Sequence, residues 1–366
     1  MRVGILTVHH SYNYGAILQA FATQKAVESL GYEVEFIDYD NTSFINRRKI
    51  FLPYNCISNV LRNLRNLGFI CQLNARKCAF EKFYKMMCIS ESRWINSIEY
   101  ANLHYDVILV GSDQTFSLYL TNNPDEMRSF FLPGYKGKKI SYASSMGEKN
   151  RNLNERDKIW MKHCWQQFSS IGVREKFAKD FIERLTGKSA QIVLDPTLLL
   201  RSKDWCAYLS CRKLPKEKYI VFYTVLSSAK VVGFVKKIEE LTHLKVIALH
   251  PKTRFDINSG FKYSIESGPQ EFLSLIQRAE YVITTSFHAT VFSIIFKKKF
   301  ITILQGEGNR LKSLLETLDL QDRLVDENVT PSLSLLESII DYDRIHTQLD
   351  SLRQNSIEYI KRAIDE

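Results

Sequence analysis

The sequence lacks any apolar run long enough to cross a membrane. A membrane-spanning helix needs roughly 18 or more consecutive apolar residues, and no segment of the 366-residue chain reaches that length. The first ten residues, MRVGILTVHH, also lack the longer apolar stretch and the cleavage site of a signal peptide, and indicate a first β-strand instead. We therefore expect a cytoplasmic protein.

Cysteine occurs without any pattern that suggests cross-linking or metal binding. The seven cysteines are odd in number and scattered, and they contain no C-x-x-C pair. Neither a disulfide framework nor a zinc site is predicted, which fits a reducing compartment. His9 and His10 are not expected to bind a metal, because no carboxylate is spaced with them along the sequence. We expect no metal ion and no organic cofactor.

Two nucleotide-binding motifs are missing as well. The loop after the first predicted strand, HHSYNYG, has no G-x-G-x-x-G, so a dinucleotide site is not predicted. The TGKS at 186–189 is not a phosphate-binding P-loop, because the glycine five positions upstream is absent and a strand follows. Internal repeats and low-complexity tracts are absent too.

Apolar, β-branched runs alternate with amphipathic helices in both halves of the chain. This alternation predicts parallel sheets, and the length favours two domains. The expected fold class is α/β, with two Rossmann-like, doubly wound domains facing a cleft. The expected units are residues 1–185 with a basic insertion at 46–93 on the acceptor side, residues 186–330 on the donor side, and C-terminal helices at 331–366 that pack back across both.

The stretch from Tyr281 to Phe296, YVITTSFHATVFSIIF, joins a buried strand to an apolar helix. The strand is predicted over 281–283, and the hydroxyls at 284–286 are suited to capping a helix that follows His288. His288 then lies beside unpaired backbone N–H groups and the positive helix pole, an environment that favours a bound anion. A histidine with satisfied hydrogen bonds in a loop is the alternative.

Other polar groups also follow predicted strands, at the sheet edge where open α/β folds bind ligands. They comprise one acid, two arginines, hydroxyls and amides: Asn13, Tyr14, Gly15, Asp113, Gln114, Ser144, Ser145, Arg174 and Arg310. Individually, an aspartate there could cap a helix and an arginine could form a salt bridge. Together with His288 they suit an anionic substrate and acid–base chemistry without a metal.

The segment from Asn46 to Arg93 is strongly basic. It holds ten Lys or Arg residues against two Glu, and so carries most of the chain's net charge of +10. Aromatic and leucine side chains at helical spacings accompany Arg62, Arg65 and Arg76, as in a helix that lies on an anionic membrane. A solvated helix with a buried apolar stripe explains the same pattern. Nucleic acid is not an expected partner, because no binding motif accompanies the charge.

Taken in order, these segments resemble the polysaccharide pyruvyltransferase family over most of residues 3–320. The similar text is ILTxxxSYNYGAILQAFA from Ile5, LGYEVEFIDY, YDVILVGSDQTF, KISYASSMG, IGVREK, VLDPTLLL and GPQEFLSLIQRAEYVITTSFHATVFSIIF. The resemblance implies a fold similar to GT-B glycosyltransferases. It also implies an enzyme that uses phosphoenolpyruvate to form a pyruvate ketal on two hydroxyls of a sugar in bacterial capsule or other exopolysaccharide. We expect a galactose-type sugar, on a lipid-linked or free oligosaccharide.

The resemblance also implies roles for single residues. His288 is the expected proton donor, and Asp113 is expected to take the hydroxyl proton or to stabilise a cationic centre. The expected donor-binding residues are Arg174, Ser144, Ser145, Lys176, Arg310 and Ser286, and the expected acceptor-binding residues are Asn13, Tyr14, Gly15 and Gln114. Some relatives carry Arg at the position of Ser286, so the phosphate charge must be met elsewhere, by Arg310 or Lys176.

Two other functions fit the same pattern. A glycosyltransferase that uses a sugar nucleotide shares the two-domain frame, and Glu307 in Gly306-Glu307-Gly308 could then bind a ribose. A carbohydrate- or anion-binding module without activity is the third reading, although an acid, an arginine and a histidine at strand ends weigh against it. If its acceptor is bound to the membrane, we expect the protein to lie at the inner face of the cell membrane.

Overall fold

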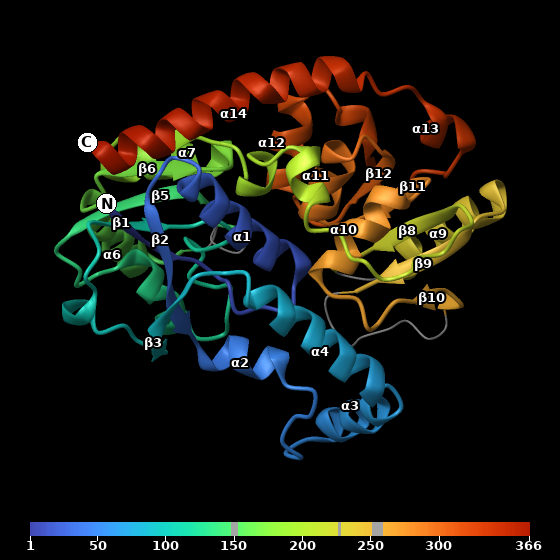
Figure 1. The fold of residues 1–366 in the computed structure, drawn as a ribbon, viewed down its shortest axis with the longest axis horizontal. Coiled ribbons are helices and arrows are strands. Elements are labelled where there is room, and N and C mark those ends of the chain that lie inside the picture. The colour runs from blue at the N-terminus through green and yellow to red at the C-terminus, as the bar shows by residue number, and fades with distance from the viewer. Residues whose placement is uncertain (148–152, 226–227, 251–258) are drawn as a thin grey trace.

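The computed structural model describes residues 1–147, 153–225, 228–250 and 259–366, which form two parallel β-sheets with interleaved helices (Figure 1). Within these residues the first sheet has seven strands in the order β3-β2-β1-β4-β5-β6-β7. The strands are β1 (Arg2–Leu6), β2 (Glu33–Asp40), β3 (Ile89–Ile95), β4 (Val107–Val110), β5 (Lys138–Ser144), β6 (Ser170–Val173) and β7 (Gln191–Ile192). The helices are α1 (Tyr14–Glu28), α2 (Thr42–Arg48), α3 (Ile57–Leu67), α4 (Ile70–Tyr84), α5 (Pro124–Arg128), α6 (Glu155–Gln166) and α7 (Lys176–Thr186).

The second sheet has six strands in the described part of the chain, in the order β10-β9-β8-β11-β12-β13. The strands are β8 (Tyr219–Tyr223), β9 (Lys245–Leu249), β10 (Lys262–Tyr263), β11 (Tyr281–Thr284), β12 (Lys299–Leu304) and β13 (Leu324–Asp326). The helices are α8 (Ser202–Cys206), α9 (Ala229–Thr242), α10 (Pro269–Arg278), α11 (Phe287–Ile295), α12 (Asn309–Thr317), α13 (Leu333–Glu337) and α14 (Tyr342–Asp365). None of the described helices combines the length and the apolar character that crossing a membrane requires.

Both sheets are doubly wound. In the first sheet β1 pairs in parallel with β2 on one side and with β4 on the other, and in the second sheet β8 pairs in the same way with β9 and β11. The central strands are buried along their whole length, as in β4 (VILV), because helices cover both faces of such sheets. The predicted two-domain α/β fold is confirmed.

The boundary between the domains lies later than the sequence indicated. β7 pairs in parallel with β6, so the first sheet continues beyond residue 185 to Ile192. The inserted part ends earlier than residue 93. The last residues of the basic segment belong to β3, which pairs with β2 as the edge strand of the first sheet. Only α2, α3 and α4 therefore form the inserted part.

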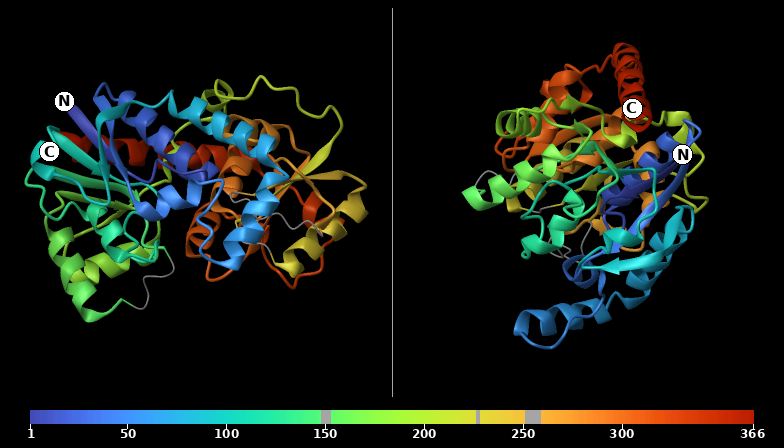
Figure 2. Two further views of the ribbon diagram at one scale, coloured as in Figure 1. Left: turned by 90° about the horizontal axis from the view of Figure 1, so that it is seen from below. Right: turned by 90° about the vertical axis from the view of Figure 1, so that its left-hand side faces the viewer.

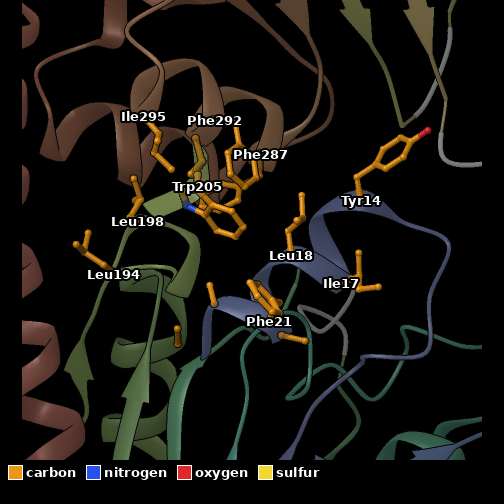
Figure 3. Packing of buried hydrophobic residues seen from close by; sticks show 14 of the residues in the cluster. Tyr14, Ile17, Leu18, Phe21, Leu194, Leu198, Trp205, Phe287, Phe292 and Ile295 are labelled. Carbon is orange, nitrogen blue, oxygen red and sulfur yellow. The ribbon is translucent and has the colours of Figure 1, made fainter. Parts of the chain in front are cut away.

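One hydrophobic core joins the two domains (Figure 3). Phe21 on α1 faces Trp205 on α8, and the ring of Trp205 meets Phe292 on α11 edge-on, with 5.0 Å between ring centroids. Trp205 is fully buried, and its indole N–H donates to the Thr197 carbonyl at 3.1 Å. Because α1 packs between the first sheet and the second domain, nearly all of its side chains are buried.

α14 packs along both domains (Figures 1 and 2). On the second domain, His346 contacts the Ile294 carbonyl through Nε2 at 3.0 Å. On the first domain, the buried Tyr359 hydroxyl donates to the Ser141 carbonyl of β5 at 2.9 Å. The helix thus bridges the sheets at the side opposite to α3 and α4 in Figure 1.

We expect Tyr359→Phe to lower the free energy of unfolding by about 1–2 kcal/mol, because it removes a buried hydrogen bond and leaves the Ser141 carbonyl short of a donor. Tyr32→Phe is the matched control, since the Tyr32 hydroxyl also binds α14, through Asp365 Oδ1 at 2.6 Å, but in an exposed place. It should cost no more than about 0.5 kcal/mol. The midpoints of urea unfolding measure both effects. Equal shifts would contradict the conclusion that the buried hydrogen bond of Tyr359 stabilises the packing of α14 on the first sheet.

Candidate functional site

The candidate site lies where the carboxyl edges of the two sheets meet. Asp113 follows β4 and His288 follows β11, so each stands where the strand order of its sheet reverses. Open α/β sheets bind ligands at this switch point. Arg174 follows β6 and Asp195 follows β7 on the same edge of the first sheet. The topology alone therefore brings these four side chains toward one place.

His288 lies in the first turn of α11. The helix begins at Phe287 with Ser286 as its N-cap, two residues earlier than the sequence indicated. The imidazole is buried, and its Nε2 lies 3.6 Å from Asp195 Oδ2. On its other side the ring meets Gly15 of α1, where a Cβ would lie 2.0 Å from Nδ1. Glycine at residue 15 is thus needed for this close approach, and not for its helical backbone.

Arg174 holds the centre of the site between two carboxylates. Its side chain is 1 % exposed, Nη1 donates to Asp195 Oδ2 at 2.5 Å, and Nη2 donates to Asp113 Oδ1 at 3.2 Å. Asp195 also accepts from the backbone N–H and the hydroxyl of Thr197, both at Oδ1. Because both carboxylates come from fixed strand ends, the guanidinium has little freedom to turn.

Phe287 and Arg310 complete the cluster from the second domain. The Arg174 guanidinium carbon lies 4.9 Å from the centre of the Phe287 ring, and that of Arg310 lies 6.0 Å from it. An aromatic face attracts a cation at such distances. Arg310 Nη1 is also 3.9 Å from Asp113 Oδ1, and about a quarter of the Arg310 side chain is exposed. Both guanidiniums therefore lie near the Phe287 ring and near the same oxygen of Asp113.

The charges within the cluster shift one another's protonation. Burial opposes ionisation of Asp195, but His288 and Arg174 outweigh it and hold the pKa of Asp195 below its ordinary value. Burial also opposes the charge on Arg174, yet Asp195 and Asp113 raise the pKa of this guanidinium. Burial raises the pKa of the neighbouring Glu175, against Arg174 and Arg310. Asp195 is thus held as an anion beside the imidazole.

A cavity of about 270 Å³ adjoins the cluster. Arg174, Asp195, Phe287 and Arg310 line it on one side, and α14 lines it on the other. Pockets that pair a few charged groups with apolar walls are the usual binding sites of small ligands. This cavity gives a small anion a route to Arg310 and to the inner guanidinium.

The predicted hydroxyl residues lie mostly inside the first sheet. Ser144 is fully buried, donates to the Val110 carbonyl at 3.0 Å and accepts from Thr115 Oγ1 at 3.1 Å, so its hydroxyl joins β5 to β4. Ser145 is buried as well, and its Oγ accepts from the N–H of Gly147 at 3.1 Å. Their backbones shape the site more than their hydroxyls, because the Ser145 N–H donates to the Asp113 carbonyl at 2.8 Å.

Two of the residues predicted to bind an acceptor also use their side chains within the protein. The Asn13 side chain caps α1 by accepting from the N–H groups of Gly15 and Ala16. Tyr14 is fully buried, its hydroxyl donates to the Ser267 carbonyl at 3.0 Å, and its ring stacks on Phe272. This places the Tyr14 side chain in the core between the domains, away from any surface that an acceptor could reach.

Three further predicted residues lie at the margin of the cluster. Gln114 follows Asp113 and is partly buried, with its side-chain oxygen over Gly147. Lys176 is exposed at the start of α7, and Ser286 is buried at the N-cap of α11. Of the two basic residues that could replace the arginine missing at position 286, Arg310 is the one inside the cluster.

Asp195 and Phe287 are site residues that the sequence did not single out. Asp195 obeys the same rule as the others, since it directly follows a predicted strand in QIVLDPT. That position was a sufficient signal, but the partner relation to Arg174 and His288 could not be seen. Phe287 gave no signal, because it is one of several aromatic residues in an apolar helix.

The complete arrangement joins anion recognition to acid–base groups. Two guanidiniums can bind a phosphate or a carboxylate, and an imidazole with an aspartate counterion can move a proton. Asp113 touches both guanidiniums and belongs to the partly exposed rim of the cluster. Such a site suits a small anionic substrate that reacts by proton transfer.

Two solved structures have a similar fold. The UDP-GlcNAc 2-epimerase of Methanocaldococcus jannaschii, in complex with UDP-GlcNAc and UDP, is 13% identical over 99% of both chains, with a TM-score of 0.54. MnaA of S. aureus, solved with UDP, is 10% identical over 99% of this chain and 96% of its own, with a TM-score of 0.52. These identities show a shared GT-B-like fold and nothing further.

No curated protein sequence matches the chain. The sequence model of one family, described as polysaccharide pyruvyl transferase, matches residues 13–306. The match begins at the N-cap of α1 and runs past β12, so it includes Asp113, Arg174, Asp195 and His288. Because it covers well over half of the chain, this protein belongs to the polysaccharide pyruvyl transferase family.

Proposed function

We propose that the protein transfers the pyruvyl group of phosphoenolpyruvate to two hydroxyls of a sugar, forming a ketal within a bacterial surface polysaccharide. A galactose-type sugar is the proposed acceptor. The observation that carries the proposal is the cluster of Arg174, Arg310, Asp113, Asp195 and His288 at both switch points in a member of this family. Phosphoenolpyruvate bears a phosphate and a carboxylate, and the cluster offers one guanidinium for each.

The first step is protonation of the donor. His288, as an imidazolium, gives a proton to C3 of phosphoenolpyruvate, which turns the double bond into a methyl group and leaves a cationic centre at C2. The positive pole of α11 opposes the imidazolium. Asp195, whose pKa lies below its ordinary value, provides the counterion 3.6 Å away. Asp195 thus acts on the chemistry through His288 and through Arg174.

The remaining steps build the ketal. One sugar hydroxyl attacks C2 and passes its proton to Asp113, and the C2–O bond to phosphate then breaks. Loss of phosphate restores the cationic centre at C2. The second hydroxyl attacks this centre, and its proton leaves with the phosphate. The proton held by Asp113 replaces the one that His288 gave, so the balance is one donor and one diol to one ketal and one inorganic phosphate. Arg174 and Arg310 hold the charge of donor and leaving group.

The experiment combines the purified protein with phosphoenolpyruvate and a panel of galactosides and mannosides in D₂O. The proposal expects phosphate release, a pyruvate-sized mass gain on one acceptor and a single deuterium in the ketal methyl group. A thermal shift with phosphoenolpyruvate alone serves if the acceptor must be lipid-linked. Stabilisation by uridine nucleotides and none by phosphoenolpyruvate would overturn the proposal in favour of a sugar-nucleotide-dependent transferase.

We expect His288→Gln and Asp113→Asn each to lower kcat by about 10²- to 10⁴-fold, because each removes a group that moves a proton. The two roles separate in the absence of acceptor. His288→Gln should abolish exchange of the C3 hydrogens of phosphoenolpyruvate with D₂O, whereas Asp113→Asn should retain it. His163→Gln, at an exposed position on α6, is the matched control. Near-wild-type turnover of both site variants would refute these roles.

Gly15→Ala tests the contact between the domains at His288. The new Cβ would meet Nδ1 at 2.0 Å, so we expect the ring to turn away from Asp195 and kcat to fall at least tenfold. Gly233→Ala is the control, since it also lies in a helix but meets no atom within 4 Å, and should gain about 0.5–1 kcal/mol of stability. Turnover and thermal melting of both variants make the comparison. Unchanged turnover in Gly15→Ala would show that the His288 position is not critical.

We also propose that α3 docks on an anionic membrane surface, where lipid-linked acceptors are assembled. Its buried face is polar, because Asn63 binds both backbone groups of Leu52 and Asn66 donates to the Ile50 carbonyl. Its exposed face is apolar, with Ile57, Leu61, Leu64 and Leu67 each more than half exposed. This inversion of the usual pattern would suit a helix that inserts its outer face among lipids.

Basic side chains accompany the apolar face. Arg62 and Arg65 lie on α3 beside Leu61 and Leu64, and the helix projects from the body of the protein (Figure 2). Arg76, which the sequence also assigned to the membrane contact, is instead buried. Its guanidinium donates to the carbonyls of His250 and Tyr12, and so ties α4 to both domains. The sequence assignment of Arg76 was wrong, because domain packing covers it.

We expect Arg62→Gln combined with Arg65→Gln to weaken binding to vesicles rich in anionic lipid by roughly 30-fold at low salt, at about 1 kcal/mol per charge. Leu61→Ser combined with Leu64→Ser should weaken it at any salt. Ile159→Ser, an equally exposed apolar site on α6, is the control. Vesicle sedimentation measures the binding, and indifference to salt and to both double variants would exclude this surface.

A further inference from the structure

His9, His10 and Asp38 meet at the carboxyl edge of β1 and β2. The two histidines lie in the loop after β1, and Asp38 lies near the end of β2. The sequence argued against a metal here because no carboxylate is spaced with the histidines, but the sheet supplies one. β1 and β2 are adjacent and parallel, with Ile5 opposite Phe36, so Asp38 reaches the histidine loop across 28 residues of chain.

Three ligand atoms of these side chains converge on a small volume. His10 Nε2 lies 2.5 Å from Asp38 Oδ1, and His9 Nε2 lies 3.7 Å from the same oxygen. One ligand atom from each residue lies within 4.8 Å of those of the others. Two imidazole nitrogens and a carboxylate oxygen are a common donor set of divalent zinc-class ions.

The ring of His9 is oriented for ligation. Its Nδ1 lies 3.0 Å from the Thr7 carbonyl, which can only accept, so Nδ1 carries the proton of the neutral ring. Nε2 then presents a lone pair toward the Asp38 carboxylate, is fully buried and has no hydrogen-bond partner. A lone pair and a carboxylate repel each other unless a cation lies between them. A backbone carbonyl that fixes the other nitrogen is the usual support of a metal-bound histidine.

Neighbouring arginines leave this carboxylate to the histidines. Arg48 and Arg93 both form ion pairs with Asp40. Arg48 Nη1 also donates to the His10 carbonyl at 2.6 Å, but not to its ring. Both guanidiniums are therefore paired with Asp40, whereas Asp38 faces the two histidines.

The cluster is also open on one side. The side chains of His10 and Asp38 are 16% and 13% exposed, whereas His9 is fully buried. Three protein ligands with one side toward solvent leave room for a water or a hydroxyl as a fourth ligand. A hydrogen bond from His10 to Asp38 would satisfy those two side chains, but His9 Nε2 would stay unpaired at a cost of about 1–3 kcal/mol. One shared ion satisfies all three.

We propose that His9, His10 and Asp38 bind one divalent transition-metal ion of the zinc class. The ion would fix the loop that continues to Asn13 and Gly15. It would thereby help to position the start of α1, which packs against His288. None of its ligands belongs to the cluster around Arg174. Its test measures metal binding, and therefore stands apart from pyruvyl transfer.

The test is titration of the full chain, stripped with chelator, with Co²⁺ and Zn²⁺. We expect one equivalent of Co²⁺ to give visible d–d absorption without a thiolate charge-transfer band, and Zn²⁺ to displace it and to raise Tm. His10→Gln and Asp38→Asn should each weaken binding by roughly tenfold or more. His104→Gln, an exposed histidine elsewhere, should bind as the wild type does.

Several outcomes would overturn the site. Absence of Co²⁺ binding by the wild-type chain is one, since His10 and Asp38 would then form a hydrogen-bonded pair beside an unligated His9. Undiminished binding by both variants is another. A thiolate band that persists in them would assign the metal to the exposed cysteines, such as Cys56 or Cys71. If Asp38→Asn fails to fold, the partly exposed His10→Gln carries the same decision.

Discussion

The buried guanidinium of Arg174 is the group on which the arrangement of the site depends. It is held by Asp195 and Asp113, and it lies on the face of Phe287 from the other domain. A buried cation requires such partners, because an unpaired one costs several kcal/mol. Satisfying it draws two strand ends and one helix of the second domain together. His288 is positioned as a consequence, since the same Asp195 oxygen faces its imidazole.

The periodic part of the fold could be predicted from the sequence with little loss. The strand predicted over 281–283 from its short apolar, β-branched run is β11, which extends one residue further, from Tyr281 to Thr284. The start of α11 was placed two residues late, since Thr284, Thr285 and Ser286 are all eligible caps. In the fold Thr284 Oγ1 instead donates to the Tyr223 carbonyl of the neighbouring strand. The cap of α11 therefore depends on a contact with the neighbouring strand as well as on local sequence preference.

Side-chain roles were harder to predict, for a different reason. Asp113, Arg174 and His288 could be named because position after a strand is a local property. The importance of Asp195 depends on an arginine 21 residues earlier and a histidine in the other domain, and no local pattern encodes that relation. Tyr14 shows the converse. Its position after a strand was right, but its side chain fills the contact between the domains.

The core shared by the two domains determines how the site can select a substrate. Three aromatic side chains pack together across the domain boundary: Phe21, Trp205 and Phe292. In addition, α14 contacts both domains. Both halves of the site therefore stand assembled before any ligand arrives. Binding energy need not drive closure, so induced fit has little to contribute to discrimination. Selection rests on preorganised shape and charge, and every poor substrate meets the same finished site as the right one.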